Sequence, residues 1–148
     1  MLTEAASGAY AVTPILAAMS GAPRVFALAR DSRYGSVAEV GDGLMKLARC
    51  AQIEERIHII TPKNREIVAE ADIITNSGQL RPIDREMIGW MKRSAVIALM
   101  YEAWELRTED IDVAACAERG IAVAGTNERH PAVDVFSFLG PRSTIRRN

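Results

Sequence analysis

The chain has 148 residues, 49 % of them hydrophobic, so it is long and apolar enough to fold as one domain around a buried core. Its 18 Lys and Arg residues nearly balance 19 Asp and Glu residues, so no overall charge favours nucleic acid or an anionic membrane as a partner. No apolar run approaches the roughly 18 residues of a membrane-spanning helix, and no basic stretch opens the chain as in a signal peptide. We therefore expect a cytoplasmic protein with neither a nucleic-acid nor a membrane partner.

The two cysteines, Cys50 and Cys116, stand alone in the sequence. Neither belongs to a CxxC pair, and no pair of histidines lies near either of them to complete a metal site. We expect neither a disulfide framework nor a bound metal.

The clearest pattern is a repeated alternation of short β-branched runs with longer segments of helical spacing. The short runs predict six strands, at residues 1–4, 25–29, 57–61, 72–76, 95–100 and 121–124. The segments between them predict five helices, at residues 10–20, 37–52, 65–70, 84–91 and 109–119. Gly and Pro residues fall between these elements, which supports their boundaries.

The last predicted helix has a marker at each end. Thr108 precedes Glu109 and Asp110, so a hydroxyl cap and first-turn carboxylates are expected at its positive end. Gly120 stands between this helix and the next strand, where a residue in the left-handed conformation commonly closes a helix.

Strict alternation of strands and helices with short connections predicts parallel strands joined by right-handed crossovers, because antiparallel neighbours would be joined by tight hairpins. The expected fold class is α/β, with a three-layer, doubly wound, Rossmann-like parallel sheet of about six strands. Residues 1–140 form one domain in this interpretation, and residues 141–148 form a loose basic tail. Such a sheet binds ligands at the carboxyl ends of its strands, near the point where strand order reverses.

The loop after the first strand is one candidate for cofactor binding. Ser7 and Gly8 stand between this strand and a helix, where small residues allow backbone amides to approach a phosphate. The pattern GxGxxG is absent, and Glu4 would repel an anion unless its side chain points away. The alternative is an ordinary turn of small residues.

Asp31 is a second candidate, because it closes the second strand 23 residues after Gly8. This spacing is close to the roughly 20 residues expected for the acid that binds a ribose hydroxyl of NAD. Arg30 and Arg33 beside it would suit the 2′-phosphate of NADP, so the cofactor prediction is NAD or NADP. The alternative is that Asp31 only caps the next helix.

Asn76, Ser77 and Gly78 follow the fourth strand and are a third candidate. Their amide and hydroxyl groups suit a nucleotide ribose or a substrate carbonyl, although a turn of Asn, Ser and Gly needs no function.

Two residues are candidates for proton transfer. Glu102 lies among the aromatic residues that follow the fifth strand, where apolar surroundings raise the pKa of a carboxyl group toward that of a general acid or base. His130 follows the last strand, near carboxylates that can orient its imidazole. A solvated loop carboxylate and an incidental surface histidine are the respective alternatives.

Residues 71–76, 83–88 and 91–97 read Ala-Asp-Ile-Ile-Thr-Asn, Ile-Asp-Arg-Glu-Met-Ile and Met-Lys-Arg-Ser-Ala-Val-Ile. In this order they resemble the NAD-binding domain of the D-isomer-specific 2-hydroxyacid dehydrogenases. Residues 110–124 resemble the substrate-binding domain of the same family. The resemblance implies a Rossmann domain that binds NAD or NADP in a dehydrogenase acting on an unknown small-molecule substrate. Met100-Tyr101-Glu102 replaces the family's Arg-Gly pair, so the family's catalytic arginine has no counterpart here.

The chain stops soon after residues 133–136, where a two-domain dehydrogenase would have a linking helix, so our hypothesis is one domain of a larger enzyme. A homodimer would be another way to complete the cleft. Two alternatives remain: a non-enzymatic nucleotide-binding or homodimeric interaction module, and an S-adenosylmethionine-dependent methyltransferase. The methyltransferase fold usually ends in an antiparallel hairpin, for which the sequence gives no signal.

Overall fold

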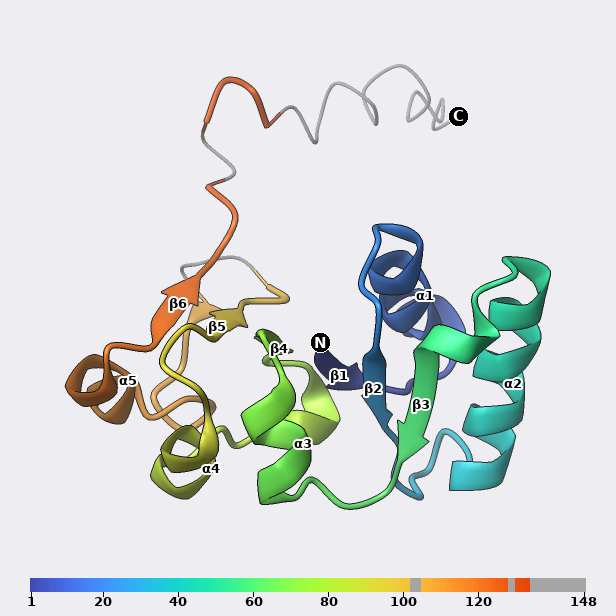
Figure 1. Ribbon diagram of the computed structural model, residues 1–148, viewed down its shortest axis with the longest axis horizontal. Helices are drawn as coiled ribbons and strands as arrows, with labels where there is room; N and C mark the ends of the chain where they lie inside the picture. The colour runs from blue at the N-terminus through green and yellow to red at the C-terminus, as the bar shows by residue number, and fades with distance from the viewer. Residues whose placement is uncertain (102–104, 128–129, 134–148) are drawn as a thin grey trace, which may run out of the picture.

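The structure, a computed structural model, describes residues 1–101, 105–127 and 130–133 (Figure 1). In this part of the chain the strands are β1 (Leu2–Glu4), β2 (Val25–Leu28), β3 (Ile57–Ile60), β4 (Ile73–Thr75), β5 (Val96–Ala98) and β6 (Ala122–Ala124). The α-helices are α1 (Val12–Met19), α2 (Val37–Cys50), α3 (Arg65–Glu70), α4 (Arg85–Trp90) and α5 (Val113–Arg119). Short 3-10 helices are η1 (Gly8–Ala11), η2 (Glu54–Arg56) and η3 (Gly78–Leu80). The predicted tail at residues 141–148 lies outside the described residues.

All six strands form one parallel sheet in the order β3-β2-β1-β4-β5-β6. This confirms the expected doubly wound α/β class. Strand order reverses between β1 and β4, which are neighbours in the sheet although β2 and β3 separate them in sequence. Since β5 and β6 also pair in parallel, the described strands do not contain the terminal antiparallel pair expected of a methyltransferase. The carboxyl ends of all six strands share one edge.

The helices form a layer on each side of the sheet. Helices α1 and α2 lie on one side, and α3, α4 and α5 lie on the other (Figure 1). Successive residues of β2 point into different cores, because strand side chains alternate: Ala27 packs with the α1 and α2 side, and Leu28 with the opposite side. No helix in the described part of the chain has the length and apolar character needed to cross a membrane.

One face of β4 and β6 is open in the part of the chain that the structure describes. Ile74 is fully buried in the core under α3 and α4, whereas its neighbour Ile73 is 43 % exposed. Ala122 and Ala124 of β6 are exposed as well. This half of the sheet therefore presents apolar surface on the side away from α3, α4 and α5.

Helix α1 is shorter than the predicted helix at residues 10–20, because the segment begins as the 3-10 helix η1. Pro14 lies in the first turn of α1, where the missing N–H of proline costs no intrahelical hydrogen bond. The 3-10 helix η1 therefore lies between the end of β1 and the first residue of α1.

The start of α5 corrects the sequence prediction. The cap is Asp112, whose Oδ1 accepts a hydrogen bond of 2.8 Å from the backbone N–H of Ala115, and not Thr108. Residues 108–110 form a turn, and Ile111 then forms a parallel bridge with Ile83. Gly120 does adopt the left-handed conformation, with φ of 70°, as predicted. Helix α5 therefore begins at Val113 and not at residue 109 as predicted.

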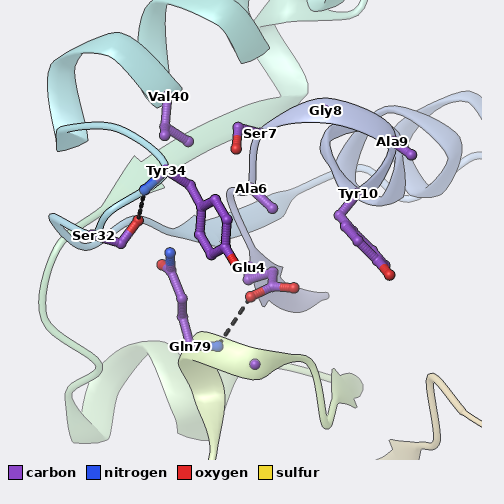
Figure 2. A pocket seen from close by; sticks show the side chains of 11 residues that line it. Glu4, Ala6, Ser7, Gly8, Ala9, Tyr10, Ser32, Tyr34, Val40 and Gln79 are labelled. Atoms are coloured by element: carbon purple, nitrogen blue, oxygen red, sulfur yellow. Dashed lines mark hydrogen bonds between the residues drawn. The ribbon is translucent and has the colours of Figure 1, made fainter.

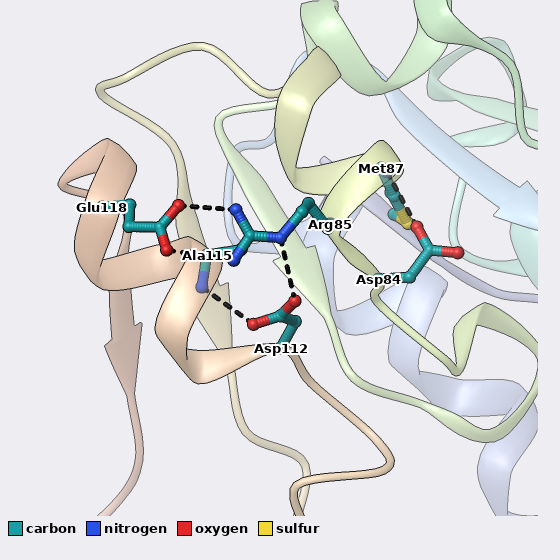
Figure 3. A network of polar contacts seen from close by, with 6 residues as sticks. All are labelled: Asp84, Arg85, Met87, Asp112, Ala115 and Glu118. Atoms are coloured by element: carbon teal, nitrogen blue, oxygen red, sulfur yellow. Dashed lines mark hydrogen bonds and ion pairs between the residues drawn. The ribbon is translucent and has the colours of Figure 1, made fainter.

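Polar contacts connect α4 to α5 (Figure 3). The Arg85 guanidinium donates to both carboxylate oxygens of Glu118, at 2.5 and 3.0 Å, and its Nε lies 3.5 Å from the Asp112 carboxylate. Arg85 holds the pKa of Glu118 below its usual value through these hydrogen bonds and through its charge. The two helices are thus joined at the N-terminus of α4 and along α5.

Replacing Asp112 with alanine should lower the free energy of unfolding by about 1 kcal/mol, because α5 loses its N-terminal cap. The matched variant Thr108→Ala should change it by less than about 0.3 kcal/mol, since the Thr108 hydroxyl makes a long hydrogen bond of 3.5 Å to the neighbouring Glu109 carboxylate and caps no helix. Urea denaturation followed by circular dichroism measures both. A larger loss from Thr108→Ala than from Asp112→Ala would contradict this assignment.

Candidate functional site

Buried hydroxyl groups join the carboxyl ends of β1 and β4. The Thr75 hydroxyl donates to the Thr3 hydroxyl at 2.9 Å, and Thr75 and Ser77 share a hydrogen bond of 2.8 Å. All three residues are buried. The loops that leave these two strands are therefore held side by side at the point where strand order reverses.

A cavity of about 580 Å³ lies between the ends of β1 and β2 (Figure 2). Its walls come from the β1–η1 loop, from the loop after β2 and from η3, and they include Ala6, Ser7, Gly8, Ser32, Tyr34 and Gln79. Figure 2 shows the Tyr34 ring in the middle of this group, between the two loops. Three of the six predicted cofactor residues, Ser7, Gly8 and Gly78, thus line one cavity.

Gly8 has a φ of 64°, which strains any side chain other than that of glycine. Ser7 precedes it in an extended conformation, and its hydroxyl caps neither η1 nor α1. The backbone thus turns sharply from β1 into η1 along the wall of the cavity.

The Glu4 carboxylate does not point away from this site. Its Oε2 accepts a hydrogen bond of 3.0 Å from the backbone N–H of Gln79, and Glu4 lines the cavity. Figure 2 shows the other carboxylate oxygen directed toward the side of Tyr10. A negative charge therefore sits where the loop after β1 meets η3. The sequence alone did not show whether the Glu4 side chain points toward this loop or away from it.

A second cavity, of about 410 Å³, lies on the β4 side of the same edge. It contains the other loop that was predicted to bind a cofactor, and its walls include Asn76, Ser77, Gly78, Arg81, Met100 and Tyr101. Glu4, Tyr10 and Gly78 line both cavities. The two cavities therefore adjoin across β1 and together run along the strand ends.

Asn76 is 1 % exposed and lies at the end of β4. Its Oδ1 accepts a hydrogen bond of 2.7 Å from the backbone N–H of Met100, which sets the orientation of the amide. Its Nδ2 has no hydrogen-bond partner among the described residues. A buried donor without a partner is costly, so it is notable at a cavity wall.

Tyr101 and Arg81 share a carboxylate at the far wall of the second cavity. Arg81 donates to Asp110 at 2.9 Å, and the Tyr101 hydroxyl donates to the same oxygen at 3.4 Å. Burial raises the pKa of Tyr101, the Asp110 charge raises it further, and the Asn76 amide acts in the opposite direction. Tyr101 is therefore held as a neutral phenol. Sequence reasoning did not single out Arg81, because no motif marks it.

Asp31 lies outside both cavity linings. Its Oδ1 accepts a hydrogen bond of 2.7 Å from the backbone N–H of Val37, the first residue of α2. Asp31 therefore contacts the N-terminus of α2, as one of the two interpretations expects. Its contact with a ribose stays a prediction.

Only one of the two predicted proton-transfer residues, His130, lies among the described residues. Glu102 lies outside the described residues. His130 is exposed, and its Nδ1 accepts a hydrogen bond of 3.1 Å from the backbone N–H of Ala132. It lines neither cavity, so its catalytic role stays a prediction.

No protein-family model and no curated protein sequence matches the chain. The shikimate 5-dehydrogenase of Listeria monocytogenes, solved in complex with shikimate and NAD, is similar in fold, with a TM-score of 0.59 at 13 % sequence identity. The match covers 84 % of this chain and 44 % of that one. The chain has the Rossmann fold. This confirms the expected Rossmann-like fold class.

Two further solved structures match this Rossmann domain. The D-lactate dehydrogenase of Lactobacillus jensenii with NAD⁺ has a TM-score of 0.47 at 17 % identity, over 85 % of this chain and 34 % of that one. The NAD-complexed D-isomer-specific 2-hydroxyacid dehydrogenase of Lactobacillus delbrueckii ssp. bulgaricus has a TM-score of 0.46 at 16 % identity, over 84 % and 33 %. The chain spans less than half the length of each of these three dehydrogenases.

The substitution Asp110→Asn should lower the pKa of Tyr101, because it removes a negative charge that disfavours the phenolate. The control Glu118→Gln, in the α4–α5 contact, should leave it unchanged. Phenolate absorbance during alkaline titration measures the effect, and the Tyr101→Phe difference assigns the signal among the three tyrosines of the chain. An unchanged pKa in Asp110→Asn would contradict the shared-carboxylate geometry.

Proposed function

We propose that this chain is the NAD- or NADP-binding Rossmann domain of a dehydrogenase. The observation that carries the proposal is the pair of adjoining cavities on either side of β1, at the strand-order reversal. Dinucleotides bind across this position in doubly wound sheets, one nucleotide against each half of the sheet.

The residues present fit such a ligand in two halves. The cavity between β1 and β2 takes the adenosine half, with Ser7 and Gly8 next to the pyrophosphate. Asp31, which follows β2 but lines neither cavity, would contact the ribose from the edge of this half. The cavity at β4 takes the nicotinamide half, beside Asn76, Ser77 and Gly78. The bound nicotinamide supplies hydride transfer, and this chain orients it. The Glu4 carboxylate is the one feature that opposes the anionic pyrophosphate.

The choice between NAD and NADP depends on the loop after β2. The Asp31 carboxylate favours a free ribose 2′-hydroxyl, whereas Arg30 and Arg33 favour a 2′-phosphate. The Arg33 guanidinium lies over the Tyr34 ring, 4.7 Å from its centre, so this cation stands beside the first cavity. Both cofactors therefore belong in the test.

The substrate is a small molecule, and Glu102 or His130 transfers the proton that accompanies the hydride. The open face at Ile73, Ala122 and Ala124 supports a second domain or a second copy of the chain that covers it. Either would close the cleft over the strand ends.

Isothermal titration calorimetry of the whole chain with NAD, NADH, NADP and NADPH tests this proposal. We expect at least one of them to bind with measurable heat. We also expect the dissociation constants of the NAD and NADP forms, which differ in the ribose 2′ group, to differ at least twofold. S-adenosylmethionine, added as a fifth ligand, tests the methyltransferase alternative. Absence of heat from all four nicotinamide nucleotides would remove the cofactor proposal.

The second candidate is a non-enzymatic homodimeric module. It is favoured by the exposed apolar residues Val12, Leu16 and Met19, which are spaced to lie on one face of α1. Sedimentation velocity gives the oligomeric state, and a dimer that binds none of the nucleotides would favour this candidate.

Glu4→Gln should tighten binding of NAD about fivefold, because a negative charge close to the pyrophosphate is removed while an acceptor for the Gln79 N–H is kept. The control Glu55→Gln removes an exposed carboxylate that lines neither cavity and should change the affinity less than about twofold. Calorimetric dissociation constants at one salt concentration measure both. Weaker binding by Glu4→Gln would show that the pyrophosphate lies elsewhere.

A further inference from the structure

The open face of β4, β5 and β6 is one continuous apolar surface. The strand register places Ile73, Val96 and Ala122 side by side across the three strands, and Ala98 and Ala124 side by side in a second row. None of these side chains is charged, and Ile73, Ala122 and Ala124 are exposed. Parallel sheets are normally covered on both faces. This half of the sheet therefore lacks its second cover among the described residues.

Helix α1 stands beside the open face and is apolar on its outer side. Its residue Thr13 lines the second cavity together with Asn76, which follows β4. Residues 5–23 contain no charged side chain. Three large apolar residues of α1, spaced to lie on one side of the helix, are 45 %, 57 % and 62 % exposed: Val12, Leu16 and Met19. A helix without a charged face is usually buried. The sheet face and α1 thus provide two apolar walls.

An apolar segment follows β6 in the chain. Residues 131–139 read Pro-Ala-Val-Asp-Val-Phe-Ser-Phe-Leu. In a helix, at about 100° per residue, the Ala, Val, Phe and Leu side chains of this segment would cover an arc of about 220°, and Asp134 and Ser137 would lie in the remainder. A helix that rests on one surface needs an apolar stripe of only about 100°. Two apolar walls are therefore needed to bury this segment.

The described residues at the start of this segment have the geometry of a helix start. The Val133 N–H donates to the carbonyl oxygen of His130 at 2.8 Å, and the His130 Nδ1 accepts the Ala132 N–H at 3.1 Å. Pro131 stands at the first position of this turn, where the missing N–H of proline costs no hydrogen bond. Residues 140 and 141 are Gly and Pro, which commonly follow the end of a helix. The sequence thus marks both ends of a helix at residues 131–139.

The chain is long enough to bring this segment to the open face. Residues 125–130 connect β6 to the turn, and six residues span up to about 20 Å. In α/β sheets a helix that follows a strand packs back onto the sheet. Helix α5 lies on the other side of the sheet, so the side next to α1 is open to the next helix (Figure 1). A second domain or a second copy of the chain would cover the same surface, but this segment is already tethered beside it.

We propose that residues 131–139 form a helix that packs between α1 and the open face of β4, β5 and β6. One side of this helix covers Ile73 and Ala122, and another side contacts Leu16. The segment thereby belongs to the domain and withdraws both apolar surfaces from a second copy of the chain. The inference does not depend on whether the strand ends bind a nucleotide.

The first arm of the test measures how fast N-ethylmaleimide modifies a thiol introduced by Ala122→Cys in the whole chain. The native Cys50 is exposed and serves as the internal reference, and peptide mass spectrometry separates the two sites. We expect the introduced thiol to react at least about tenfold more slowly than Cys50, because the docked helix must open first. Equal rates would show that the face is uncovered and would overturn the inference.

Variants of the segment show whether the segment is the cover. In the Ala122→Cys chain, Phe136→Ser combined with Leu139→Ser should raise the modification rate at least about fivefold, because the apolar contacts are lost. The control, Asp134→Asn combined with Ser137→Ala, changes the polar side of the same segment and should leave the rate within about twofold. Unchanged protection after the apolar substitutions would mean that something else covers the face, which contradicts the proposal.

Sedimentation velocity at the labelling concentrations separates this cover from a second copy. We expect a monomer whose protection is independent of protein concentration. Protection that appears only as a dimer forms would assign the face to a second copy and overturn the inference.

The second arm leaves the segment unaltered and so decides the question even where its variants do not fold. It compares Leu16→Ser in α1 with Leu47→Ser in α2, two leucines that are 57 % and 43 % exposed to the described residues' surroundings. We expect Leu16→Ser to lower the midpoint of thermal unfolding by about 5 °C or more and Leu47→Ser by less than half as much, because only Leu16 contacts the segment. An equal or smaller shift from Leu16→Ser would contradict the proposed packing.

Discussion

The parallel pairing of β1 with β4 is the constraint on which the rest of this structure depends. Thr3 and Thr75 are 72 residues apart in sequence, yet their buried hydroxyls are hydrogen-bonded at 2.9 Å, and Leu2 pairs with Ile74. Because the polar groups are buried, they must satisfy one another, which favours a single register. The loops after β1 and β4 consequently leave the sheet side by side, and the two cavities adjoin there.

The same edge contains polar groups that stability alone does not explain. The Glu4 carboxylate caps η3 but faces a proposed pyrophosphate, and the Nδ2 group of Asn76 is buried without a partner among the described residues. A buried donor without a partner costs free energy, whereas the Glu4 carboxylate is satisfied by the Gln79 N–H.

The order and type of elements followed from local pattern, whereas contacts between distant residues set several boundaries. Gly120 ends α5 as predicted, because the left-handed conformation depends on the glycine itself. Thr108 looked like the cap of that helix, but residues 108–110 form a turn, Ile111 pairs with Ile83, and the helix begins only after Asp112. Asp31 matched a ribose-binding spacing, and the fold uses one of its oxygens to cap α2.

The sequence by itself determined the α/β class, the six strands and the edge at which a ligand would bind, because hydrophobic period and chain punctuation are local properties. Only the tertiary structure decided that Glu4 faces the cavities, that Arg81 is paired with Asp110 and that the Asn76 donor is buried without a hydrogen-bond partner among the described residues. Each of these depends on which side chains meet across loops distant in sequence. No local pattern specifies such encounters, since they arise only when the sheet brings the strand ends together.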